Sequence, residues 1–238
     1  MESWKVGDNA HIEVPGRAGF TGATPLVRAY FAGWTTVKTV GETMNPDTQH
    51  NILLLLDTIY HRQVMMVESL TDVGISSEDQ LGTITDYGYA TTQSNASTYV
   101  GIYPVDKQTG VALTHAMEDP NPFTDADATA NDMCTKTSYP ISLQSQISTR
   151  LSVTSFTVKE FGSADALSGR IFQPGSKDIT DYTSFWVGNT PFKPFTTYDV
   201  RVIGKVSGGL AGTGFNVDKT WSFTTGVNLI TCPNLPHL

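Results

Sequence analysis

The most constraining feature of the sequence is an alternation of apolar and polar residues in its C-terminal half. It recurs in residues 151–158, 198–203 and 219–226, and residues 208–214 between the last two are rich in glycine. Successive side chains of a strand point to opposite faces of a sheet, so the alternation predicts strands with one buried face. Short strands separated by turns predict a β-sandwich over residues 138–228, followed by a tail at 229–238.

The N-terminal part mixes two periodicities. Residues 26–34 and 47–67 have apolar side chains three and four positions apart, which predicts helices. Residues 71–75, 82–88 and 99–103 resemble strands. We therefore predict an α+β first domain over residues 1–103. Residues 104–137 contain three prolines and several acidic side chains, which predicts a partly extended linker.

Composition excludes some classes of partner and favours an exported protein. The net charge is −8 with 16% charged residues and no cluster of Lys and Arg, which argues against nucleic acid. The longest apolar run, residues 52–56, is too short to span a bilayer. Abundant Gly, Ser and Thr favour an extracellular setting, although residues 1–4 have neither the basic start nor the apolar core of a signal peptide.

The two cysteines, Cys134 and Cys232, are compatible with one disulfide in an oxidising compartment, or with two unrelated thiols. A bridge would close a long loop, and the loss of chain entropy in the unfolded state would stabilise the fold by about 4 kcal/mol.

Several spaced motifs resemble those of bacterial CAP proteins, also called SCP-like extracellular proteins, that carry a C-terminal immunoglobulin-like module. The matching segments are residues 11–16, 19–25 with Arg28, 33–34, 40–42, 59–62, 73–75, 102–104, 109–111, 118–122, 197–200 and 221–226. The resemblance implies an α-β-α sandwich for residues 1–103 and a secreted or cell-surface protein. The family's first helix would precede His11, where only ten residues stand. A missing helix would expose apolar surface that a second copy could cover, so a homodimer is a further expectation.

The resemblance also implies a polar cleft with two histidines and two acidic residues. His11, Glu42 and His61 match three of these by motif, and Thr43 stands where the family has Asn. The second acidic residue has no clear match; Asp57 lies one helical turn before His61 but is not equivalent.

Two imidazoles and a carboxylate support two kinds of chemistry. His11, His61 and Glu42 could bind zinc or another divalent metal, with a bound water as nucleophile. Without a metal, the same residues could act as catalytic acid and base. Alternatively, both histidines are structural. His115 would be at most an accessory ligand. The sequence has no Gly-x-Ser-x-Gly, His-Glu-x-x-His or phosphate-loop motif.

These observations leave three hypotheses for function. The first is an extracellular binding protein whose cleft takes a divalent metal or a small apolar ligand such as a lipid or sterol, or which contacts a cell-surface partner. The second is a hydrolase acting on an ester or peptide. The third is a structural surface protein.

A set of aromatic residues in the C-terminal half has two interpretations. The set comprises Phe185, Trp186, Phe192, Phe195, Tyr198, Trp221 and Phe223. Such residues could form a carbohydrate-binding platform, but alternation places Trp221 and Phe223 on one strand face and favours a core.

Overall fold

The structure is a computed structural model. It describes residues 11–45, 51–78, 82–89, 98–118, 120–123, 130–176, 178–208 and 214–227. The chain divides into two compact units. The first unit comprises Met1–Leu55, Val64–Ser94 and Leu235–Leu238, and the second comprises Leu56–Gln63 and Asn95–Asn234.

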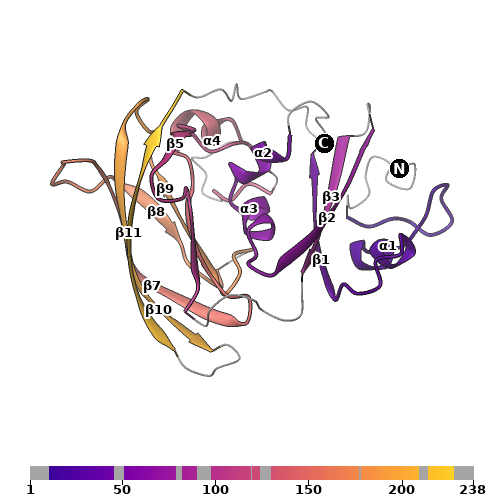
Figure 1. Cartoon of the computed structure of the whole chain (residues 1–238). Coiled ribbons are helices and arrows are strands. Elements are labelled where there is room, and N and C mark those ends of the chain that lie inside the picture. The colour runs from indigo at the N-terminus through magenta and orange to yellow at the C-terminus, as the bar shows by residue number, and fades with distance from the viewer. Residues whose placement is uncertain are drawn as a thin grey trace. The chain divides into compact units, whose positions relative to one another are not determined.

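The first unit is built on a three-stranded antiparallel sheet. Its strands β1 (Thr39–Asn45), β2 (Leu70–Glu78) and β3 (Gly82–Tyr89) lie in the order β1-β3-β2. Helix α1 (Pro25–Phe31) packs beside β1 (Figure 1). Thr24 caps this helix by accepting a hydrogen bond from Val27 N, and Pro25 occupies its first turn, where its missing N–H costs nothing. The indole of Trp34 lies against Gly88 of β3, where a Cβ would be 1.9 Å from the ring, so the position requires glycine.

The helix predicted over residues 47–67 is two short helices, α2 (Asn51–Leu56) and α3 (Tyr60–Met65). Residues 46–50 lie outside the described part of the chain. The break falls at residues 57–59, where the buried carboxylate of Glu118 accepts hydrogen bonds from the N–H groups of Ile59 and Tyr60. These bonds satisfy donors that open a helix, so a new helix starts there instead of the first one continuing.

The second unit is a β-sandwich of two four-stranded sheets. One sheet has the order β5-β11-β10-β7 and the other β4-β6-β9-β8. The strands are β4 (Val100–Tyr103), β5 (Gln108–Val111), β6 (Ile141–Ser145), β7 (Thr149–Glu160), β8 (Gly169–Phe172), β9 (Thr183–Gly188), β10 (Thr197–Gly208) and β11 (Phe215–Thr225). A short helix, α4 (Ala130–Lys136), precedes β6.

One hydrophobic core joins the two sheets of the sandwich. It includes Leu143 of β6, Trp186 of β9, Val158 of β7 and Val200 of β10. Burial along β10 alternates nearly residue by residue, as the sequence pattern predicts. Trp221 and Phe223 are buried, which confirms their interpretation as core residues.

The expectation of an α-β-α sandwich for residues 1–103 is wrong. The protein is mostly β, with 45% strand and 11% helix, and the described part of the chain forms four short helices and three sheets. Helices α1, α2 and α3 have seven, six and six residues. At 1.5 Å per residue each is about 10 Å long, too short to form a helical layer over a sheet. The regular apolar spacing of residues 47–67 fits one long helix, and nothing in that spacing indicates the break at Ile59.

Much of the segment predicted as a linker, residues 104–137, packs into the second unit. β5 pairs in parallel with β11, and Thr114 bridges to Ser138. Phe123 and Met133 are buried in a second hydrophobic cluster with Ile59 and Phe185. Cys134 in α4 is disulfide-bonded, and Cys232, the only other cysteine of the sequence, lies outside the described residues. Among the described helices, none is long and apolar enough to span a bilayer.

Candidate functional site

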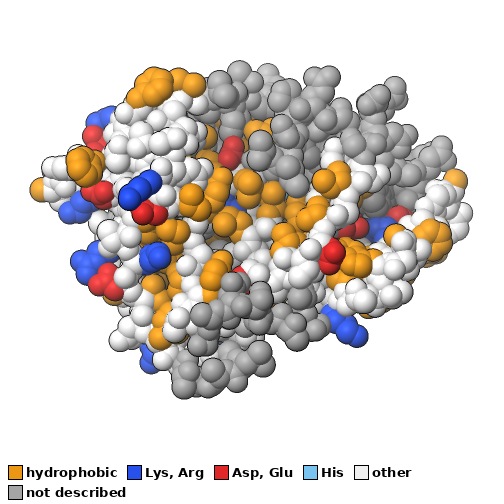
Figure 2. Space-filling view, viewed as in Figure 1, with side chains coloured by type: hydrophobic (Ala, Val, Ile, Leu, Met, Phe, Trp, Pro, Cys, Tyr) orange, Lys and Arg blue, Asp and Glu red, His pale blue; other side chains and the backbone are white. Residues whose placement is uncertain are grey.

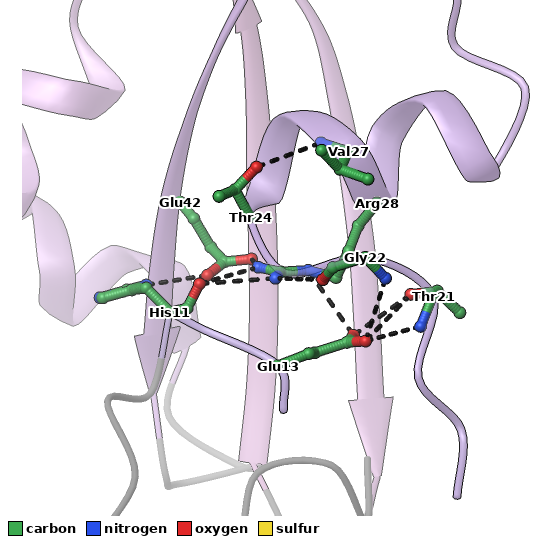
Figure 3. A network of polar contacts seen from close by, with 8 residues as sticks. All are labelled: His11, Glu13, Thr21, Gly22, Thr24, Val27, Arg28 and Glu42. Carbon is green, nitrogen blue, oxygen red and sulfur yellow. Dashed lines mark hydrogen bonds and ion pairs between the residues drawn. The ribbon is translucent and has the colours of Figure 1, made fainter. Parts of the chain in front are cut away.

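The first unit brings His11 and Glu42 together. His11 Nδ1 lies 2.8 Å from Glu42 Oε1, across 31 positions of sequence (Figure 3). The other carboxylate oxygen, Oε2, accepts a hydrogen bond of 2.5 Å from Arg28 Nη2. Glu42 stands in the middle of β1 and Arg28 on α1, so packing of the helix beside the strand forms the ion pair. The Glu42 and Arg28 side chains are 2% and 8% exposed, whereas that of His11 is 46% exposed.

A second carboxylate, Glu13, completes the network around Arg28. Glu13 Oε2 accepts hydrogen bonds from Thr21 N at 2.7 Å and Gly22 N at 3.3 Å, and Oε1 lies 3.7 Å from Arg28 Nε (Figure 3). Arg28 Nη1 also donates to Gly22 O at 3.3 Å. A Cβ at Gly22 would come within 2.9 Å of Arg28 N, so glycine is required for this close approach.

Glu13 is a site residue that the sequence analysis missed. The resemblance implies two acidic residues in the cleft, and only Glu42 was matched. Glu13 follows His11 by two positions, and residues at this spacing share a face when the chain is extended. The spacing of His11 and Glu13 could therefore have indicated Glu13 as the second acidic residue.

Asp86 lies beside Glu42 on the neighbouring strand. The two residues are direct partners in the antiparallel pairing of β1 with β3, so their side chains share a face of the sheet. Burial and the charge of Glu42 raise the pKa of the Asp86 carboxyl to about 7. Burial also raises the pKa of Glu42, but hydrogen bonds from His11 and Arg28 outweigh it and hold that pKa below its ordinary value. Glu42 is therefore ionised at neutral pH, whereas Asp86 is only about half ionised there.

This arrangement suits proton transfer or hydrogen bonding by His11. An ionised carboxylate can only accept hydrogen bonds, so the Nδ1 atom that contacts Glu42 carries a proton. Arg28 fixes the carboxylate, and the carboxylate fixes the orientation of the ring. Because nearly half of the His11 side chain is exposed, small molecules in solution can reach the imidazole.

His61, the third residue predicted for the cleft, belongs to the second unit. Its Nδ1 lies 3.2 Å from Glu118 Oε2, and His115 Nε2 lies 3.3 Å from Glu118 Oε1. His115 and Glu118 are buried. Burial raises the pKa of Glu118, but its contacts with His115 and His61 outweigh burial and lower the pKa to about 2. Asp57 has a pKa raised by burial.

The described residues contain no group of three or more His, Cys, Asp or Glu side chains arranged to hold a metal ion. His11 and Glu42 are brought together, but Glu42 is already committed to Arg28 and His11. In the second unit, His61 and His115 both engage the carboxylate of Glu118, which binds two backbone N–H groups as well. That cluster therefore ties the start of α3 to the segment around residues 115–118.

Comparison with known proteins gives no family assignment. No protein-family model matches the chain, and no curated protein sequence is significantly similar to it.

Proposed function

We propose that the chain is a secreted or cell-surface binding protein, related in its motifs to the CAP proteins, that takes a small amphipathic ligand at His11. The observation that carries the proposal is the exposed imidazole of His11 held by the buried pair of Glu42 and Arg28. A buried ion pair is costly to desolvate. Here the pair orients an exposed imidazole, which supports a role of His11 in ligand binding.

The polar end of the ligand would be recognised by His11. The solvent-exposed edge of the His11 ring would accept a hydrogen bond from a hydroxyl of the ligand, or donate one to a carboxylate when the ring is protonated. Such a bond discriminates strongly when it is partly shielded from water.

The apolar end would be recognised by hydrophobic side chains of the same chain segment. Ile12, Phe20, Val27 and Phe31 are exposed, with Phe31 the most exposed at 71%. They occur within twenty residues of His11 and flank Glu13, Thr21 and Arg28 in the sequence. Exposed apolar side chains of this kind can contact the apolar part of ligands such as fatty acids and sterols.

The disulfide at Cys134 supports the proposed location. Cys134 is disulfide-bonded, and disulfides persist mainly in secreted and cell-surface proteins. The net charge of −8 agrees with a protein that is not recruited by anionic lipid surfaces or nucleic acid.

Titration with two fluorescent probes, a sterol (dehydroergosterol) and a fatty acid (cis-parinaric acid), tests the proposal. Saturable binding of at least one probe is expected. His11→Ala should weaken it about tenfold, because the hydrogen bond between the imidazole and the polar end of the ligand is lost. The measurement is the dissociation constant from fluorescence at increasing protein concentration.

His61→Ala is the matched control, since it removes an imidazole of the second unit that contacts Glu118. It should leave the dissociation constant unchanged. Absence of saturable binding by either probe, or an equal loss in both variants, would overturn the proposal.

A second candidate is a hydrolase in which His11 activates water as a general base. It is favoured by one observation, the alignment of an exposed imidazole on a buried carboxylate, which is how many catalytic histidines are oriented. Water rather than a side chain would attack the ester carbon, and His11 would take the proton.

Hydrolysis of p-nitrophenyl butyrate by the full chain tests this candidate. If His11 is the base, His11→Ala should lower kcat/KM by about 100-fold to 10,000-fold, because general-base catalysis contributes that much. His61→Ala should retain the wild-type rate. A wild-type rate no higher than that of buffer would rule out this activity on esters.

A further inference from the structure

A small cavity lies at one end of the sandwich in the second unit. Its volume is about 220 Å³, and Leu167, Ser168, Asn189, Thr190, Phe192 and Lys193 are among the residues that line it. Pockets for drug-sized ligands begin at about 300 Å³, so this one suits a smaller group, such as one ring of a longer molecule. The lining residues come mainly from the loop between β7 and β8 and from the loop between β9 and β10.

The polar side chains of the cavity are held in place. Asn189 Nδ2 donates to Ser168 Oγ at 2.8 Å, and Asn189 N donates to Ser168 O at 3.1 Å, which joins the two loops. Across the cavity, Lys193 Nζ lies 2.6 Å from Glu160 Oε1. The lining thus offers hydroxyl, amide, ammonium and carboxylate groups whose formal charges cancel, together with apolar walls from Leu167 and Phe192.

Two exposed phenylalanines are close in sequence to residues that line the cavity. Phe161 follows Glu160 and is 73% exposed, and Phe195 lies two positions after Lys193 and is 75% exposed. Both belong to the same end of the sheet, because Phe161 N donates to Thr197 O at 2.9 Å. Of the aromatic set considered for carbohydrate binding, Phe195 alone is exposed.

The backbone at Phe195 is strained. Its φ is +50°, a left-handed conformation that bulky residues rarely adopt. Strain of this kind is kept where the fold or a ligand site requires a particular side-chain direction. Here it accompanies a large apolar ring in water, which is unfavourable for the isolated protein.

We propose that this end of the sandwich binds a neutral sugar residue of a glycan. A pyranose ring presents hydroxyls around its edge and C–H groups on its faces. The hydroxyls match Ser168, Asn189, Thr190 and the Lys193–Glu160 pair, and the C–H faces match the exposed rings of Phe161 and Phe195.

The charge distribution favours a neutral ligand over a strongly charged one. On the face shown in Figure 2, Lys and Arg side chains over the sandwich are interspersed with Asp and Glu. A site for a sulfated or sialylated glycan would need a concentrated positive charge, whereas Lys193 is neutralised by Glu160.

Saturation-transfer NMR on the full chain with three neutral disaccharides, N,N′-diacetylchitobiose, cellobiose and maltose, tests the proposal. We expect at least one of these disaccharides to bind with a dissociation constant of about 1 mM, which is usual for a small polar ligand in a shallow site. Phe195→Ala should weaken it about three- to tenfold through loss of the aromatic contact. Asn189→Ala should weaken it by a similar factor through loss of a hydrogen bond.

Val105→Ala is the matched control, since Val105 is another exposed apolar residue of the second unit. It should leave binding unchanged, and thermal melts should show that all variants fold. No transfer to any of the three disaccharides, or equal transfer in wild type and Phe195→Ala, would overturn the proposal. Self-association of the chain that disappears in Phe195→Ala, with no sugar binding, would instead assign this end to a protein contact.

Discussion

Arg28→Met is expected to lower the free energy of unfolding of the first unit by about 3–5 kcal/mol. The guanidinium is 8% exposed and contacts two carboxylates, Glu42 at 2.5 Å and Glu13 at 3.7 Å. Methionine keeps much of the aliphatic stem but removes the charge, which leaves two buried carboxylates without their cation. Repulsion between them and their poor solvation then oppose folding.

Hydrogen exchange measured by mass spectrometry would follow this change, because it reports each unit separately. Amides of β1 and β3 should lose protection in Arg28→Met, while those of β10 should keep it. Arg201→Met is the control: Arg201 forms a bidentate pair with Asp218, but both side chains are more than half exposed. Surface pairs contribute little, so this variant should behave as wild type. Unchanged protection in Arg28→Met would show that the network of Figure 3 does not support the fold.

Glu118→Gln is expected to destabilise the second unit by about 3 kcal/mol at neutral pH, from the depression of the Glu118 pKa alone. That pKa is about 2 in the folded protein against 4.5 in the unfolded chain. Glu118 accepts hydrogen bonds from Ile59 N at 2.7 Å and Tyr60 N at 2.9 Å, and contacts His61 and His115. The glutamine amide has one acceptor oxygen, so one of the two N–H groups would face another donor.

Because folding lowers the pKa of Glu118, the destabilisation caused by Glu118→Gln depends on pH. A carboxyl with a depressed folded-state pKa contributes stability that is fully present above the unfolded pKa of 4.5 and is lost as pH falls toward about 2. The difference in unfolding midpoint between wild type and Glu118→Gln should therefore be constant from pH 7 to about 5 and shrink below it. Urea titrations at several pH values would measure it. Asp165→Asn, a change at an exposed carboxyl, should show no such difference. A difference at pH 2 as large as that at pH 7 would contradict this role of the Glu118 charge.

The sandwich was predictable from the sequence because its strands carry a local signal. Alternation in residues 198–203 reflects the burial of Val200 and Val202 between two sheets. The helices were less predictable, since apolar spacing in residues 47–67 fits one long helix as well as two short ones. The break depends on Glu118, which is 59 residues away from Ile59.

The contacts of the candidate site were likewise not predictable from local sequence patterns. No local pattern pairs His11 with Glu42, and motif resemblance alone suggested that they meet. Glu13 was not predicted because its role depends on the turn that brings Thr21 N to its carboxylate. Asp86 was not predicted because its role depends on the register of β1 with β3. The association of His61 with Glu118 and His115 could not be predicted either, because the contact of His61 with Glu118 spans 57 residues. Polar networks of this kind are made by tertiary pairing, which periodicity does not encode.

Nitrogen-15 NMR of the His11 imidazole, recorded during titration with the better-binding probe (the sterol or the fatty acid), would show whether the ligand contacts this ring. Wild-type resonances would be assigned by comparison with His11→Ala. We expect a proton on Nδ1, hydrogen-bonded to Glu42, and a shift of the His11 ring resonances that saturates together with the fluorescence signal. The resonances of His61 and His115 should not shift. Saturable binding of the probe with no change at His11 would place the ligand elsewhere and contradict the account.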